Sequence, residues 1–172
     1  MRAPAAGFTL IEMMIVVLIV AILAVASIPE LGRYTRKSRT VEAVEALDKV
    51  AAGAQVYYTR TQKLPGSSPT FVPMQTLADA CANFNGIIQP AAGEWDTEPW
   101  ISLTFQMAQN PRYRYRWVHD PSSGPPTEGN AYAEGDLDCD GEMSLWRVRL
   151  TGNPEGSLDR RGPYIFMGDS IE

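Results

Sequence analysis

Residues 7–12 read GFTLIE, and an uncharged apolar run follows from residue 13 to residue 28, just before Pro29. The segment from Phe8 to Ile28 is 21 residues long. A helix of about 20 apolar residues spans the hydrocarbon core of a bilayer. We therefore expect a transmembrane helix over residues 8–29, with the rest of the chain built outward from this anchor.

This segment differs from a secretory signal peptide. The leader, residues 1–7, is short and carries one charged side chain, Arg2. The small residue Gly7 precedes the apolar run, whereas a signal peptide has its cleavage site after it, so a cut at Gly7 would leave the helix on the mature protein. Glu12 places a carboxylate inside the apolar segment, which costs about 2.5 kcal/mol or more near a bilayer centre. Glu12 is therefore a candidate functional residue that needs a partner.

The GFTLIE motif and the apolar helix resemble the class III signal of type IV pilins and type II secretion pseudopilins. Pro29 matches the proline of this family, and residues 34–42 (YTRKSRTVE) are similar to the stretch that follows in type IVa pilins. The resemblance implies cleavage between Gly7 and Phe8 by a membrane-embedded prepilin peptidase and N-methylation of the new Phe8 amine. It also implies that Glu12 neutralises the Phe8 amine of a neighbouring subunit in a filament.

The resemblance implies further partners and a location. The partners are copies of the chain and other pilins, the prepilin peptidase, and an inner-membrane assembly platform with a separate assembly ATPase. The C-terminal domain would be periplasmic before assembly, on a single-pass inner-membrane anchor, and extracellular in the filament. The positive-inside rule alone favours the opposite orientation, because basic residues are denser after the helix than in the leader. We follow the resemblance, since a prepilin leader is cleaved on the cytoplasmic face and two cysteines suit an exported domain.

Length and charge are consistent with an anchor and one domain. The chain has 172 residues and a net charge of −5, one unit more negative if Arg2 leaves with the leader. A single domain usually has about 100–150 residues. An acidic protein does not favour nucleic acid as a whole, so such binding requires a local basic patch.

After the anchor, the pattern indicates an amphipathic helix over residues 30–60. Pro29 removes a helical hydrogen bond, and with Gly32 nearby it marks a place where the helix can bend or loosen. Glu42, Glu45 and Asp48 are most simply part of a solvated charged face. The helix should end near Arg60, before the LPG sequence at 64–66. Its apolar stripe, spaced by three, four or a multiple, should pack on a sheet: Leu31, Tyr34, Val41, Val44, Leu47, Val50, Ala51, Ala54 and Tyr57 or Tyr58.

Residues 61–99 are predicted to form a proline-rich connection with a short helical region over 74–84, and residues 100–172 an antiparallel sheet with C-terminal loops. Alternating patterns predict strands at 101–107, 112–118, 131–134 and 144–150, with a loop at 120–130. Residues 164–167 would be an edge strand or a packed tail. The expected fold is α+β and pilin-like, with a long N-terminal helix on a roughly four-stranded antiparallel sheet.

Two features of the domain suggest specific chemistry. Cys81 and Cys139 are the only cysteines; an even pair in an exported domain favours a disulfide, and two buried thiols are the alternative. Residues 136–142 (DLDCDGE) copy the first half of a calcium-binding loop but lack its second half. Asp and Gly also have ordinary roles in an acidic hairpin turn. Calcium is thus the one cofactor suggested, with candidate ligands Asp136, Asp138, Asp140 and Glu142.

The strand at 112–118 alternates arginines with aromatic rings, which invites a nucleic-acid interpretation through Arg112, Arg114 and Arg116. The arginines and rings of one strand point to opposite faces, so we favour rings in the core and arginines on the surface.

Catalysis has little support. His119 is the only histidine, and neither a GxSxG motif nor a phosphate-binding loop is present. We expect a filament subunit, a major or minor pilin for motility, adhesion or DNA uptake. The alternatives are a type II secretion pseudopilin and a non-polymerising, membrane-anchored periplasmic domain that binds calcium.

Overall fold

The computed structural model describes residues 7–119, 127–153 and 155–167, without the side chains of residues 29 and 165–167. Residues 1–6 of the expected leader and most of the expected loop at 120–130 therefore lie outside the described residues. Contacts divide the chain into two units, Met1–Thr35 and Arg36–Glu172. One helix, α1 (Leu10–Thr61), has residues in both units.

The α1 helix confirms the predicted long N-terminal helix. It is 52 residues long and ends one residue beyond the predicted Arg60. Its backbone is helical through Pro29 and Gly32, so a bend there stays a prediction about assembly. An 18-residue window of α1 has a mean hydropathy of 2.9 and no buried residue, and α1 is long and apolar enough to cross a membrane.

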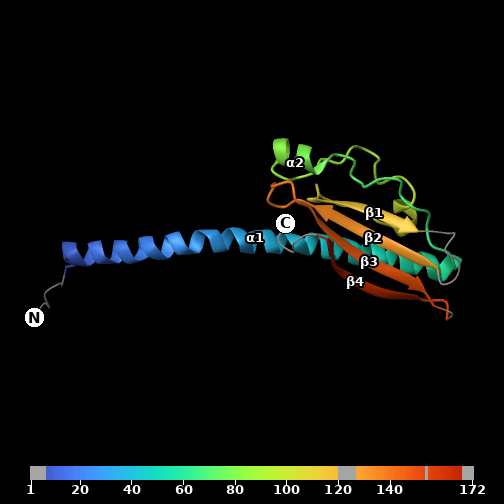
Figure 1. Ribbon diagram of the computed structural model, residues 1–172, viewed down its shortest axis with the longest axis horizontal. Helices are drawn as coiled ribbons and strands as arrows, with labels where there is room; N and C mark the ends of the chain where they lie inside the picture. Colours follow the sequence, from blue (N-terminus) through green and yellow to red (C-terminus); the bar gives the residue numbers. More distant parts are fainter. Residues whose placement is uncertain (1–6, 120–126, 154, 168–172) are drawn as a thin grey trace, which may run out of the picture. The chain divides into compact units, whose positions relative to one another are not determined.

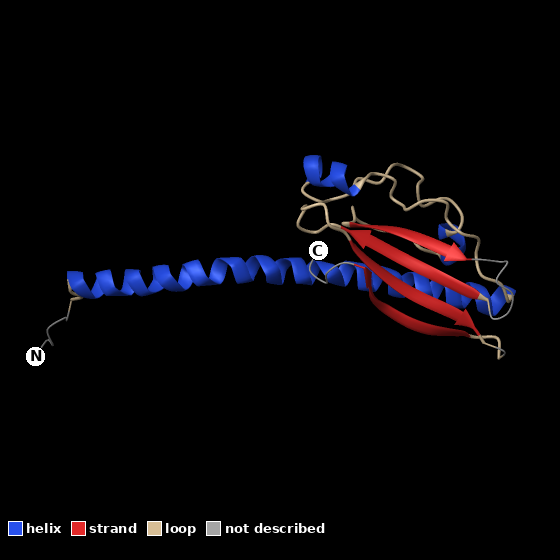
Figure 2. Ribbon diagram, in the orientation of Figure 1, coloured by secondary structure: helices blue, strands red, loops and turns tan. Residues whose placement is uncertain are grey.

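In the second unit, the C-terminal half of α1 packs on one face of a four-stranded sheet (Figures 1 and 2). The strands are β1 (Tyr113–His119), β2 (Glu128–Gly135), β3 (Ser144–Gly152) and β4 (Leu158–Met167). They run antiparallel in the order β1-β2-β3-β4. The fold is α+β and pilin-like, as predicted. The expected strand at 131–134 is longer than predicted, and the predicted edge strand at 164–167 is the end of β4.

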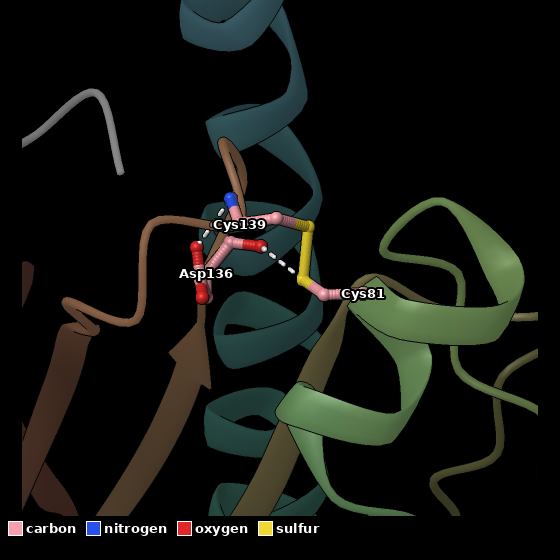
Figure 3. Close-up of side chains that lie close together, drawn as sticks. All are labelled: Cys81, Asp136 and Cys139. Atoms are coloured by element: carbon pink, nitrogen blue, oxygen red, sulfur yellow. Dashed lines mark hydrogen bonds between the residues drawn. A yellow bond between two sulfur atoms is a disulfide. The ribbon is translucent and has the colours of Figure 1, made fainter.

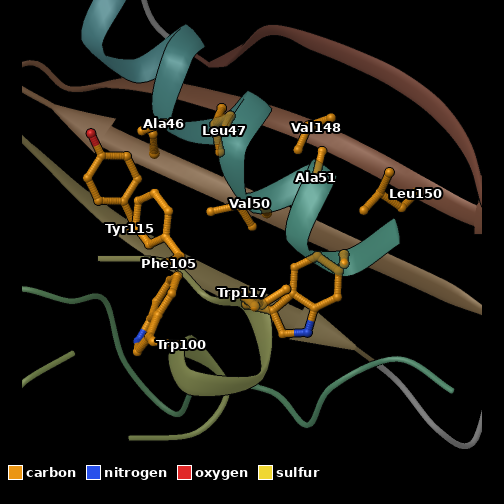
Figure 4. Packing of buried hydrophobic residues seen from close by; sticks show 14 of the residues in the cluster. Ala46, Leu47, Val50, Ala51, Trp100, Phe105, Tyr115, Trp117, Val148 and Leu150 are labelled. Atoms are coloured by element: carbon orange, nitrogen blue, oxygen red, sulfur yellow. The ribbon is translucent and has the colours of Figure 1, made fainter. Parts of the chain in front are cut away.

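The core lies between α1 and the sheet (Figure 4). Strand β1 contributes three aromatic rings that are almost fully buried, Tyr113, Tyr115 and Trp117, because alternate residues of a strand share a face. From α1 the buried residues are Ala43, Ala46, Leu47, Val50, Ala51, Ala54 and Tyr58. The prediction that Leu31, Tyr34 and Val41 belong to this stripe is wrong, since they are 67%, 73% and 51% exposed. The small residues Ala43 and Ala46 face the core instead.

The predicted strand at 101–107 is absent, and this prediction is wrong. Residues Trp100–Leu103 form a short helix, α3, which ends at Thr104 in the left-handed conformation. Trp100 and Leu103 are each 1% exposed, whereas Ile101 is 59% exposed. Within α3, burial therefore follows a spacing of three, and Phe105, just after the helix, is buried as well. Gly53 of α1 permits this packing, because a Cβ atom there would lie only 1.9 Å from the carbonyl oxygen of Leu103.

The connection between α1 and β1 covers the edge of the sheet. Val72 exchanges two backbone hydrogen bonds with Tyr115, at 2.8 and 2.6 Å, and the Ser68 amide donates to the Trp117 carbonyl oxygen at 2.9 Å. These contacts occupy backbone groups that an edge strand would otherwise expose. The connection also contains α2 (Leu77–Phe84), which confirms the predicted short helix over 74–84.

Candidate functional site

The start of α1 is organised by Thr9 and Glu12. The Glu12 amide donates to Thr9 Oγ1 at 3.3 Å, and the Thr9 amide donates to Glu12 Oε2 at 3.4 Å. This reciprocal pair is a capping box, which satisfies amides that have no partner within the helix. The Thr-x-x-Glu spacing is visible in the sequence, so the capping role of Thr9 could have been predicted from it. Glu12 thus has a local partner, and its carboxylate remains exposed.

The apolar side chains at the start of the described chain are exposed. Phe8 is 76% exposed, Leu10 79% and Val25 73%. Gly32 has no atom within 4 Å of the position a Cβ would take. The apolar side chains of residues 8–28 are therefore available to a bilayer or to other subunits.

Cys81 and Cys139 form a disulfide, which joins α2 to the loop after β2 (Figure 3). The Cα atoms are 5.5 Å apart, and the bond closes a sequence separation of 58 residues. Leu77, Ala80 and Ile88 form a separate small apolar cluster beside this link. The disulfide therefore links the α2 region to the sheet at a place where few apolar residues pack together.

The acidic loop that follows β2 is arranged as a turn with many internal hydrogen bonds. Asp136 is buried and accepts hydrogen bonds from the amides of Cys139 at 2.7 Å and Gly141 at 3.1 Å. Asp138 pairs with Arg36 of α1 at 2.8 Å. Oxygen atoms of Asp136, Asp138 and Asp140 lie within 4.8 Å of one another. Of the four predicted calcium ligands, the structure brings these three together, and Glu142 is not part of the cluster.

Glu42 occupies a position that the sequence did not indicate. Its carboxylate accepts hydrogen bonds from the amides of Arg112 at 2.8 Å and Tyr113 at 3.3 Å, and from the hydroxyl of Tyr115 at 3.2 Å. Burial raises the pKa of Glu42, although these hydrogen bonds oppose the shift. The interpretation of Glu42 as part of a solvated face is wrong, because it connects α1 to the start of β1.

Asp48 also contacts the sheet, since it forms an ion pair with Arg160 of β4. The two acidic side chains thus hold α1 to opposite edges of the sheet, Glu42 at β1 and Asp48 at β4. Glu45 remains exposed, as a solvated face predicts.

The arginines of β1 lie on the face opposite the core, as predicted. Arg114 forms an ion pair with Glu134 of β2. Arg112 lies just before β1, and its guanidinium donates to the carbonyl oxygen of Asn85 at 2.9 Å. At the end of the strand, His119 Nδ1 lies 3.0 Å from the carbonyl oxygen of Glu128. This contact with a backbone carbonyl agrees with a strand-end role and involves neither a nucleophile nor a carboxylate.

Comparison with protein families identifies the N-terminal segment. Residues 2–28 match the family model of the prokaryotic N-terminal methylation motif. Comparisons with curated proteins and with solved structures gave no match. The motif supports a protein of the type IV pilin or pseudopilin kind, and it suggests a structural subunit. The class III signal and the apolar helix fit membrane anchoring before assembly.

Proposed function

We propose that this chain is a subunit of a type IV pilus, assembled into an extracellular helical filament through residues 8–28. The observation that carries the proposal is the exposed apolar segment of residues 8–28, which belongs to the methylation motif and contains one carboxylate, Glu12. The domain of residues 36–172 would be periplasmic before assembly and would lie on the filament surface afterwards. Cleavage between Gly7 and Phe8 and methylation of the Phe8 amine would precede assembly.

The cost of keeping the Glu12 carboxylate in the bilayer would favour transfer of the subunit from the membrane into the filament. A carboxylate near the centre of a bilayer is destabilising by about 2.5 kcal/mol or more. In a filament, the Phe8 amine of a neighbouring subunit would offset this by pairing with Glu12, and apolar helices would replace lipid around residues 8–28. Pro29 and Gly32 are the proposed place where α1 bends or loosens on this passage.

The two roles of Glu12 can be separated by substitution. Glu12→Gln keeps a side-chain oxygen that can accept from the Thr9 amide, because Gln also serves in a capping box, but it removes the charge. Thr9→Ala removes the other half of the capping box and keeps the charge. We expect Glu12→Gln and Glu12→Ala to remain in the membrane and to be depleted from sheared filaments, and Thr9→Ala to be incorporated. Normal incorporation of Glu12→Gln would refute the charge-pairing role.

A type II secretion pseudopilin is the second candidate, because it would have the same processing motif and anchor. Sheared surface filaments that contain the chain support the pilin proposal. Dependence of protein secretion on the chain, with no surface filaments, would favour the pseudopilin.

Calcium binding by the acidic loop is a separate proposal, supported by the close approach of its three aspartates. The hydrogen bonds to Asp136 and the ion pair of Asp138 with Arg36 also satisfy these groups without an ion. A calcium ion would therefore compete with Arg36 for Asp138. Calcium dependence without processing at Gly7 would favour a non-polymerising, membrane-anchored recognition domain.

A further inference from the structure

The sheet face opposite α1 has a row of alternating arginine and tyrosine side chains. Arg116 of β1 pairs in register with Tyr132 of β2, Tyr132 with Arg147 of β3, and Arg147 with Tyr164 of β4. Directly paired residues of antiparallel strands project from the same face. All four side chains are partly or largely exposed. The row therefore crosses the whole sheet on its solvent side.

Contacts between neighbours hold this row in place. The Arg147 guanidinium carbon lies 5.3 Å from the centre of the Tyr164 ring, and Arg147 Nε donates to the Tyr164 hydroxyl at 3.0 Å. Beyond β1, the Phe71 ring extends the row, with the guanidinium carbon of Arg116 at 5.9 Å from its centre. Rings from Phe71, β2 and β4 thus lie on the same face as the arginines of β1 and β3. Within β1 alone the rings and arginines point to opposite faces, so the sequence of that strand did not predict this arrangement.

The charge of this face contrasts with that of the whole chain. Glu134 and Glu128 form ion pairs with Arg114 and Arg149, which flank the row in the sequence. Arg116 makes no hydrogen bond or ion pair with any residue that the structure describes, and its Nε is unsatisfied. Arg147 donates to a neutral phenol and keeps its positive charge. The row is therefore a local positive feature on a protein of net charge −5.

We infer that this face binds single-stranded nucleic acid. Arg116 and Arg147 would contact phosphates, and the rings of Phe71, Tyr132 and Tyr164 would stack on bases. Tyr132 and Tyr164 lie two strands apart, about 9.6 Å, with an arginine between them. Four-stranded antiparallel sheets use exposed rings in this way to stack two or three bases. A duplex hides the faces of its bases between neighbouring base pairs, so exposed rings beside arginines favour a single strand over a duplex.

The inference is independent of the filament proposal, since it concerns only residues of the sheet. The direct test is fluorescence anisotropy of the full chain in nonionic detergent micelles with a labelled 20-nucleotide oligothymidine, alongside a labelled duplex of the same length. We expect tighter binding of the single strand. No binding at low salt, or equal binding of the duplex, overturns the inference.

Two variants separate charge from stacking. Arg116→Gln with Arg147→Gln should weaken binding at least tenfold and reduce the magnitude of the log–log salt slope by about 1.4, because two phosphate contacts are lost. Tyr132→Leu should weaken binding by between about fivefold and a hundredfold and leave the salt slope unchanged, as expected for loss of base stacking. Unchanged affinity in either variant contradicts the inference.

The matched control removes the same charge elsewhere. Arg60 and Lys63 are exposed at the end of α1, and Arg60→Gln with Lys63→Gln should leave affinity and salt slope unchanged. Thermal unfolding of each variant checks that it is folded.

A measurement on the unmodified chain adds an independent test. Photocrosslinking to an oligonucleotide that contains bromodeoxyuridine should label peptides that contain Tyr132 or Tyr164. Crosslinks found only in other peptides overturn the inference.

Discussion

Replacement of Gly53 by alanine tests the packing of α1 against α3. In an exposed helix interior, this change stabilises a protein by about 0.5–1 kcal/mol, because glycine loses more conformational entropy on folding. Here the added Cβ would lie 1.9 Å from the backbone oxygen of Leu103 and 2.8 Å from its carbonyl carbon. A carbon–oxygen contact requires about 3.3 Å, so α3 would have to move by about 1.4 Å. A backbone oxygen cannot avoid the clash by a change of rotamer.

The cost of this movement should exceed the gain in helix propensity. Overpacking of a core costs about 1–3 kcal/mol or more, and the displaced helix carries two buried residues, Trp100 and Leu103. We expect Gly53→Ala to be about 2 kcal/mol less stable than the natural chain. At about 2–4 °C per kcal/mol for a protein of this size, the melting temperature should fall by about 4–8 °C.

Thermal unfolding of the full chain in detergent micelles, followed by near-ultraviolet circular dichroism, measures this effect. The signal should also change at low temperature, because Trp100 lies 5.3 Å from Trp95, centre to centre, in an aromatic cluster. Gly32→Ala is the matched control, since no atom lies within 4 Å of its added Cβ, and it should not lower the melting temperature. A Gly53→Ala protein that melts at or above the natural chain, with an unchanged spectrum, would refute the close packing.

The remaining predictions concern the disulfide, Glu42 and the acidic loop. Replacing Cys81 and Cys139 by serine should destabilise the chain by about 4 kcal/mol, the chain-entropy estimate for this loop, and equal melting of the variant and the oxidised chain would contradict this. Burial raises the pKa of Glu42, so the folded state binds the proton more tightly, and this contribution to stability is lost as the pH rises from about 4.5 through the raised pKa. Glu42→Gln should therefore gain stability relative to the natural chain over that pH range. Glu42→Ala should lose about 1–3 kcal/mol of stability at all pH values, because it leaves amides unsatisfied. If the melting temperatures of Glu42→Gln and the natural chain ran parallel with pH, the raised pKa of Glu42 would be excluded. If the acidic loop binds calcium, millimolar calcium should raise the melting temperature and Asp138→Asn should abolish the rise, and no response of the natural chain would leave the loop as a turn.

Local patterns predicted most of the fold. The β1 strand was predictable because its aromatic residues alternate with arginines, and alternate residues share a face. The end of α1 was predictable because a proline and a glycine follow it closely. The disulfide was expected from the cysteine count and the exported location implied by the resemblance.

The features that the sequence did not predict depend on contacts between distant residues. Ile101, Leu103 and Phe105 alternate like a strand, but the contact of Leu103 with Gly53, 50 positions earlier, belongs to a helix. Glu42 bonds to Arg112, which is 70 residues away. The arginine–tyrosine row exists only in the register of four strands, and no single stretch of sequence contains it. The sequence pattern therefore predicted neither the register of the strands nor the docking of the helices.

The proposed function requires that this chain is cleaved after Gly7, methylated at Phe8 and assembled into filaments. The most direct measurement is intact-mass spectrometry of the protein recovered from filaments sheared from the parent cells. We predict a chain that begins at Phe8, carries one additional methyl group and retains the disulfide. A chain that retains Met1, or one found only in the membrane fraction while filaments are present, would contradict the proposed function.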